Sequence, residues 1–231
     1  MGMDTAAYVS NLLRNNMRLF SAIYDFNVEI MGYMHGDFSK GIGSEKFIQS
    51  LMQSPTYRGK FLEYVRQQLG IDSLGWYNFS ETRCFLCLLS AEEIHRIICY
   101  MGGICFSEQI RKIIWGRELL KIKGTIGNDA YLFSIRSAPL IVKAEVAESF
   151  RAEGSTLVES IFNTGKTIIE MSLSGVRLEI IQRFMLKFPK NFGWNFNHRV
   201  DNPQYYFEFI KKVVKRAIAE SNNIAVSMIK A

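Results

Sequence analysis

Apolar residues recur at helical spacing along most of the chain, and this periodicity constrains the fold more than any other feature. One early stripe, which Asp4 can cap, follows the i, i+3, i+4, i+7 pattern of an amphipathic helix and consists of Val9, Leu12, Leu13, Met17, Phe20 and Tyr24. The apolar–polar alternation of a strand is not sustained, and its best candidate is residues 140–147. The sequence therefore predicts an all-α, multi-helix fold with at most a minor strand near residues 140–147.

Capping residues, glycines and prolines predict where the helices begin and end. Ser80 can cap a helix that continues through Leu89. Ser90 and Glu93 then have the spacing of a capping box for the next helix. The expected helix ends lie at Gly70, at Gly102-Gly103, at Gly124, and before Pro55, Pro139 and Pro189.

Composition indicates a globular protein, because 48% of the 231 residues are hydrophobic and 22% are charged. No Ser/Gly/Pro-rich linker divides the chain, which favours one domain over residues 1–231, with an N-terminal helical part at 1–79 and a helical core at 80–231. The N-terminus has no signal-peptide pattern, and the longest apolar run, Ile97 to Phe106, is shorter than the roughly 18 residues of a membrane span. We expect a soluble cytoplasmic protein whose cysteines are thiols.

The formal net charge is +6, and the basic residues gather in two segments, residues 111–143 and 182–199. Solvated helix faces are the commonest explanation of such segments, but a basic patch also suits an acidic partner. Ile113 and Ile114 are expected to face inward while the neighbouring cations reach solvent. The candidate partner-binding residues are Arg111, Lys112, Arg117, Lys121 and Lys123. The same charge leaves open an alternative function as a basic helical nucleic-acid-binding module.

Three cysteines and one histidine follow the pattern C-x2-C-x7-H-x3-C, which has the ligand types of a small zinc site. The four candidate ligands are Cys84, Cys87, His95 and Cys99. Against a metal, the capping box puts the two pairs on separate helices, and the first pair lies among apolar residues. The sequence favours core packing for these residues and for Cys105, so we expect no metal and no cofactor. A Cys/His metal- or thiol-dependent protein is the less favoured alternative.

Two other stretches carry weaker suggestions of a site. Gly165-Lys166-Thr167 matches the end of a phosphate-binding loop, but Ser160 replaces the glycine required five positions earlier. The stretch from Phe188 to Phe196 interleaves aromatic and basic residues, which can stack single-stranded bases but more often close the end of a helical bundle. We therefore predict no nucleotide site and no catalytic residue.

The segment from Leu88 to Val142 resembles a known family. LLSAEEIHRIICYMGGICFSEQIRKII gives a leucine-rich turn, a helix closed by glycine and a helix with basic residues. After it come the Leu119-Leu120 helix, Gly127, Tyr131-x-Phe133 and Arg136-x-Ala138-Pro139-Leu140. This order resembles the YscK/SctK family, the cytoplasmic adaptor of bacterial type III secretion machines.

The resemblance implies a non-enzymatic scaffold with no metal at the cysteine-bearing hairpin. Such adaptors connect the cytoplasmic domain of the inner-membrane ring protein to the pods of the sorting platform, and thereby to protein export. The implied location is the cytoplasm, in peripheral association with the secretion machine at the inner membrane. No contact residue of the family transfers position by position, so none is carried over to this chain.

Overall fold

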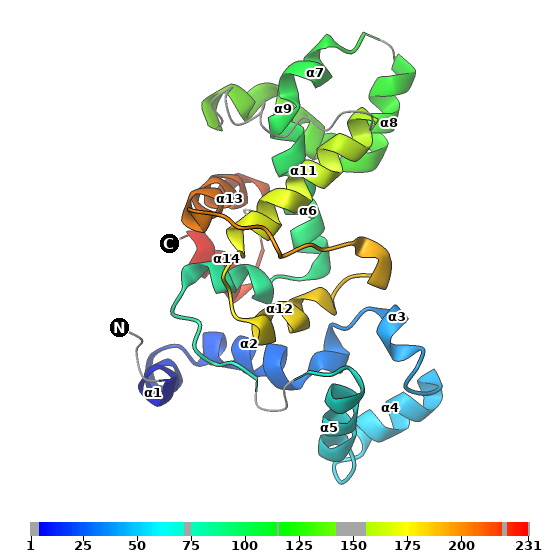
Figure 1. The fold of residues 1–231 in the computed structure, drawn as a ribbon, viewed down its shortest axis with the longest axis vertical. Coiled ribbons are helices and arrows are strands. Elements are labelled where there is room, and N and C mark those ends of the chain that lie inside the picture. Colours follow the sequence, from blue (N-terminus) through cyan, green and yellow to red (C-terminus); the bar gives the residue numbers. More distant parts are fainter. Residues whose placement is uncertain (1–4, 72–74, 115, 142–155, 219–220, 231) are drawn as a thin grey trace. The chain divides into compact units, whose positions relative to one another are not determined.

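The computed structural model describes residues 5–71, 75–114, 116–141, 156–218 and 221–230, and every regular element in these ranges is a helix (Figure 1). The predicted all-α fold is therefore confirmed. Residues 142–147 of the candidate strand lie outside the described ranges, whereas residues 140 and 141 end a helix, α9 (Asn128–Ile141). None of the described helices is both long enough and apolar enough to cross a lipid bilayer.

The chain divides into two compact units, each assembled from separate stretches of sequence. The first unit comprises Met1–Ala91, Val176–Gly193 and Asn223–Met228. The second comprises Glu92–Gly175, Trp194–Asn222 and Ile229–Ala231. The organisation as one domain, with parts at 1–79 and 80–231, stays a prediction.

The first unit packs short helices around an apolar core. Its helices are α1 (Thr5–Asn15), α2 (Met17–Val28), η1 (Ile30–Gly32), α3 (Gly36–Ser39), α4 (Glu45–Gln53), α5 (Arg58–Gln68), η2 (Thr82–Leu88), α12 (Leu178–Met185) and η3 (Lys190–Phe192), where η marks a 3₁₀-helix. One buried cluster consists of Ile30, Phe61, Leu62, Val65, Ile71 and Leu186. α4 and α5 form a hairpin (Figure 1), and they end beside Pro55 and Gly70 as predicted. Gly70 has a φ of 64°, a conformation that favours glycine.

The long N-terminal helix of the prediction is in fact two helices. α1 ends at Asn15, and Asn16 caps α2 because its side-chain oxygen accepts a hydrogen bond from the N–H of Leu19 at 3.1 Å. Such a side-chain to backbone bond competes with continuation of a helix. Asp4, the expected cap of the first helix, lies outside the described residues.

The segment after Ser80 forms the 3₁₀-helix η2 rather than the predicted α-helix. The four consecutive residues Cys84 to Cys87 are all buried, so this segment has no solvent face of the kind an amphipathic α-helix needs. The ammonium of Lys187 donates hydrogen bonds to the carbonyl oxygens of Cys87 at 2.7 Å and Leu89 at 2.5 Å. A side chain distant in sequence therefore satisfies the carbonyls at the end of η2.

The second unit contains the longer helices. They are α6 (Ala91–Cys105), α7 (Ser107–Lys112), α8 (Gly116–Ile126), α9, α11 (Leu157–Ser172) and α13 (Pro203–Ala217), and α14 (Ile224–Lys230) contributes residues to both units. α11 packs against α13 and α8, while α7 and α8 both pack against α9. These contacts place α8 beside the start of α11, where the candidate site lies.

Gly102-Gly103 lies inside α6 and does not end it, and atoms of neighbouring helices occupy the space that a Cβ at either glycine would need. A Cβ at Gly102 would lie 1.8 Å from the carbonyl oxygen of Ile161 in α11. Reciprocally, a Cβ at Gly165 in α11 would lie 2.0 Å from the carbonyl oxygen of Ile98 in α6. The crossing of α6 and α11 is therefore close enough to require glycine on both helices.

Two further helix ends differ from the prediction. α8 continues through Gly124 to Ile126, and the chain turns instead at Gly127, whose φ is 86°. α9 includes Pro139 and ends at Ile141, although a proline disfavours helix at the position before it. Arg111, one of the candidate partner-binding residues, makes the contact that permits this continuation.

Candidate partner-binding surface

The five candidate cations lie on two consecutive helices of the second unit. Arg111 and Lys112 form the last turn of α7, and Arg117, Lys121 and Lys123 lie along α8. All are exposed except Lys123, which is half-buried. Two of them contact their own chain, two line a pocket, and Lys112 is exposed at the end of α7.

Arg111 supports the neighbouring helix α9. Its guanidinium donates a hydrogen bond to the backbone carbonyl of Ile135. Within a helix that carbonyl would accept from the N–H four residues later, but the residue there is Pro139, which has no N–H. Arg111 supplies a donor to this carbonyl, which explains how α9 continues through the proline.

Lys123 also packs against α9. Its ammonium lies 4.6 Å from the centroid of the Tyr131 ring, which is a cation–π contact. Lys123 therefore helps to hold α8 on α9, and its charge is partly covered by the aromatic face.

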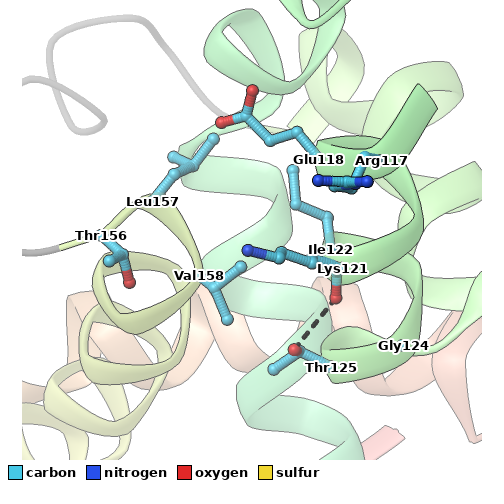
Figure 2. A pocket seen from close by; sticks show the side chains of 9 residues that line it. All are labelled: Arg117, Glu118, Lys121, Ile122, Gly124, Thr125, Thr156, Leu157 and Val158. Carbon is cyan, nitrogen blue, oxygen red and sulfur yellow. Dashed lines mark hydrogen bonds between the residues drawn. The ribbon is translucent and has the colours of Figure 1, made fainter. Parts of the chain in front are cut away.

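Arg117 and Lys121 line an open pocket of about 950 Å³ between α8 and the first turn of α11 (Figure 2). Figure 2 shows the side chains of Lys121 and Ile122 on α8 projecting toward Leu157 and Val158 on α11. Glu118 contributes a carboxylate to the same lining. The pocket thus combines an apolar interior with a charged rim in which cations outnumber the acid.

The start of α11 is fixed by a capping box. The side chain of Thr156 accepts a hydrogen bond from the N–H of Glu159 at 3.3 Å, and the Glu159 carboxylate accepts from the N–H of Thr156 at 3.0 Å. This positions Leu157 and Val158 at the pocket. These two lining residues were not among the site residues predicted from the sequence. The T-x-x-E spacing could have located the helix start, but no local pattern indicates that it pairs with α8.

Apolar side chains are exposed beside the cations. Ile114 is 92% exposed and Leu120 is 70% exposed. The expectation that Ile114 faces inward is wrong, because α7 ends at Lys112 and Ile113 adopts an extended conformation that carries the chain off the helical stripe. The surface of α7 and α8 is therefore mixed, with cations and large apolar side chains together.

The second basic segment, residues 182–199, is only partly exposed: Lys190 and Arg199 reach solvent, whereas its other two cations are buried. Arg183 is 0% exposed, and its guanidinium donates to the carbonyl oxygens of Glu179 at 3.0 Å and Asn27 at 3.4 Å. Lys187 is 6% exposed and supports the end of η2. These two cations hold together the first unit, so neither a binding patch nor a solvated helix face describes them.

The four cysteines are buried, which confirms their predicted place in the core. Burial raises the pKa of Cys99 to about 11 and the pKa values of Cys84 and Cys105 to about 12. The sulfur of Cys99 lies 3.7 Å from Nδ1 of His95, its neighbour one helical turn away. Within the described ranges, no group of three or more His, Cys, Asp or Glu residues could hold a metal ion. The absence of bound zinc stays a prediction.

Gly165-Lys166-Thr167 lies in the middle of α11, so its backbone is not a phosphate-binding loop between a strand and a helix. Lys166 lies 3.8 Å from the carboxylate of Glu170, which is 2% exposed. The same carboxylate accepts a hydrogen bond from the N–H of Asn195 at 2.7 Å and lies 3.2 Å from Nε2 of His198. This buried acid ties the segment before α13 to α11.

The aromatic stretch from Phe188 to Phe196 takes part in packing. Phe188 is buried, and its ring centroid lies 5.2 Å from that of Phe184 and 4.8 Å from that of Phe192 in the first unit. Trp194 and Phe196, in the second unit, are half-buried and stacked on each other. The packing interpretation describes Phe188 better than the base-stacking one.

Comparison with known proteins identifies the family. The family model described as YOP proteins translocation protein K (YscK) matches residues 23–221. No curated protein and no solved structure matches the chain significantly. The matched range extends well beyond the resembling segment, residues 88–142, and includes α7, α8 and α11 with the pocket between them. Because the match covers most of its length, the chain belongs to the YscK family of type III secretion machinery proteins.

Proposed function

We propose that this chain is a non-enzymatic adaptor of the cytoplasmic sorting platform in a type III secretion system. It links the cytoplasmic domain of the inner-membrane ring protein to the pod protein, and hence to protein export. The observation that carries the proposal is the family match over residues 23–221. In this role the protein acts in the cytoplasm, in peripheral association with the machine at the inner membrane, and needs no cofactor.

The α7–α8 surface is the proposed contact with one of these partners. Lys112, Arg117 and Lys121 are exposed next to Ile114 and Leu120. In protein interfaces, apolar anchors supply most of the affinity while opposite charges direct encounter and orientation. Arg111 and Lys123 contribute by holding α7 and α8 against α9, where their contacts support the surface from within.

Affinity purification of the tagged protein from its native host, followed by mass spectrometry, tests the proposed partners. We expect the inner-membrane ring protein and the pod protein to be recovered together with the chain. Recovery of neither protein, or of nucleic acid whose binding falls steeply with salt, would contradict the adaptor function and favour the nucleic-acid alternative.

Charge reversal tests the proposed surface. The variant Lys112→Glu/Arg117→Glu/Lys121→Glu should weaken binding to the acidic partner at low salt, and the difference from wild type should shrink at high salt because screening removes the attraction. Arg111 is left unchanged because its loss would also disturb α9. The matched control is Arg18→Glu/Lys46→Glu/Lys60→Glu, which reverses three exposed cations of the first unit. Circular dichroism checks that both variants fold.

A further inference from the structure

The pocket between α8 and α11 has the chemistry of a protein-binding groove. Ile122, which lines it, is buried, whereas Leu157 and Val158 are half-buried and therefore only partly covered by the described chain. Arg117 and Lys121 are exposed at its rim. An occupant therefore needs apolar side chains for the interior and carboxylates for the rim.

One face of α8 presents a continuous stripe beside this pocket. Arg117, Leu120, Lys121 and Gly124 follow the i, i+3, i+4, i+7 spacing of a single helical face, and all four are exposed. Leu120 is a large apolar side chain in that stripe. It is exposed and takes no part in the packing of α8, whose inner face buries Ile122 instead. The stripe extends the apolar and basic character of the pocket along the helix.

Gly124 leaves this stripe open to close approach beside the pocket. A glycine inside a helix lowers stability relative to alanine. At Gly102 and Gly165 close helix packing accounts for the glycine. At Gly124, by contrast, nothing among the described residues lies within 4 Å of the position of a Cβ apart from the adjoining backbone of its own helix, and the same holds for Gly59 in α5. Packing of the described chain leaves room at both positions, but only Gly124 lines the pocket, where the missing side chain lets a partner backbone approach α8 closely.

We infer that this groove binds an acidic amphipathic helix of a protein partner. The helix would place apolar side chains on Leu157 and Val158, place carboxylates against Arg117 and Lys121, and cross α8 at Gly124. The inference rests on the proposed function and adds to it the site and the chemistry of the partner segment. Nucleic acid fits less well, because the apolar side chains of the interior offer nothing to phosphates.

Gly124→Leu tests the groove without removing any charge. Leucine favours helix, and in the described chain it meets no neighbour near Cβ, so we expect the variant to melt at the wild-type temperature or above. Its side chain fills the space of the partner backbone, and we expect affinity for the pod protein or for the ring protein's cytoplasmic domain to fall by about tenfold or more.

The matched control is Gly59→Leu on α5, another exposed helical glycine with no described atom within 4 Å of its Cβ position. This variant should bind both proteins as wild type does. Titrations use the purified pod protein and ring-protein cytoplasmic domain of the same secretion system, with a short RNA duplex and a short DNA duplex as further probes.

A photo-crosslinking side chain in place of Thr125, which lines the pocket, identifies the occupant. We expect it to capture a peptide of the bound partner that is rich in Asp and Glu and has apolar residues at helical spacing. A captured peptide without net negative charge would overturn the proposed occupant.

The outcomes separate the two proposals. If wild type binds one of the proteins and folded Gly124→Leu binds it equally well, the groove is not the docking site and the adaptor function stands. If wild type binds neither protein, the adaptor function fails and the inference fails with it. If the duplexes compete with protein for wild type but not for Gly124→Leu, the groove binds nucleic acid and the inference is wrong.

Discussion

At the scale of single residues, replacement of glycine by alanine is expected to have opposite effects on stability at Gly102 and at Gly124. Gly102→Ala places a Cβ 1.8 Å from the carbonyl oxygen of Ile161, so α6 and α11 must separate. We expect a net loss of about 2–3 kcal/mol in the free energy of unfolding, despite the better helix propensity of alanine. Gly124→Ala meets no such neighbour and should gain about 0.5–1 kcal/mol.

Urea denaturation followed by circular dichroism measures both changes. Gly165→Ala provides a second test of the crossing, because its Cβ would lie 2.0 Å from the carbonyl oxygen of Ile98. Equal gains in stability for Gly102→Ala and Gly124→Ala would show that α6 and α11 do not approach each other this closely.

The buried thiols predict a loss of stability at high pH. Burial raises the pKa of Cys99 to about 11 and the pKa values of Cys84 and Cys105 to about 12. The pKa of a cysteine in an unfolded chain is about 8.5. Above that pH the native state holds more protons than the unfolded state, so each step upward in pH favours unfolding. The stabilisation from these thiols is complete below about pH 8.5 and is lost progressively toward pH 11–12.

Thiol labelling at pH 8 checks the same burial directly. The native protein should react slowly with a maleimide reagent, and all four cysteines should react once the protein is denatured, because the thiolate is the reactive form. Metal analysis should find no stoichiometric zinc. About one zinc per chain, with unfolding when a chelator is added, would mean that some of these thiols are ligands.

At the scale of elements, η2 depends on a lysine that lies about a hundred positions further along the chain. Lys187→Met keeps much of the side-chain volume but removes both donors to the carbonyls of Cys87 and Leu89. Because buried carbonyls without donors destabilise the folded state, we expect the free energy of unfolding to fall by about 2–4 kcal/mol. The control Lys46→Met, at an exposed position of α4, should change stability by less than about 0.5 kcal/mol.

Chemical denaturation of the two methionine variants measures this difference. A Lys187→Met variant as stable as wild type would indicate that η2 holds its shape without the ammonium, and that Lys187 is buried for another reason.

The same long-range dependence explains which elements the sequence could predict. Local rules located the helix ends at Pro55 and Gly70, because a proline or a left-handed glycine acts within its own turn. They failed at Gly102, where the reason for the glycine is Ile161 in another helix, and at Pro139, where α9 is supported by Arg111. Periodicity identifies helices, but it does not identify their neighbours.

The candidate site shows the same division. Charge counting found Arg117 and Lys121, which line the pocket, but it could not separate them from Arg111, which supports α9, or from Arg183, which is buried. The apolar half of the pocket was missed because α8 and α11 meet only in the folded chain. A Lys or Arg in the sequence predicts a cation available to a partner only when its side chain does not bind a carbonyl or an aromatic ring of the folded chain.

At the scale of the whole molecule, neither compact unit is a continuous piece of chain. The first unit combines residues 1–91 with residues 176–193, and contacts within it join the two stretches. Arg183 donates to the carbonyl of Asn27, and Lys187 donates to that of Cys87. Cutting the chain after residue 91 therefore removes side chains that the first unit needs for its own core.

We accordingly predict that a fragment of residues 1–91 does not fold alone. The fragment lacks α12, whose Ile180 and Phe184 are buried, and it leaves the carbonyls at the end of η2 without Lys187. Circular dichroism should show little helix and no cooperative thermal transition. Titration with a synthetic peptide of residues 176–193 should restore part of the helical signal in a saturable way, whereas a peptide with Arg183→Ala and Lys187→Met should not. A cooperative transition in the fragment alone would mean that local packing among α1 to α5 suffices, and that α12 joins a unit already formed.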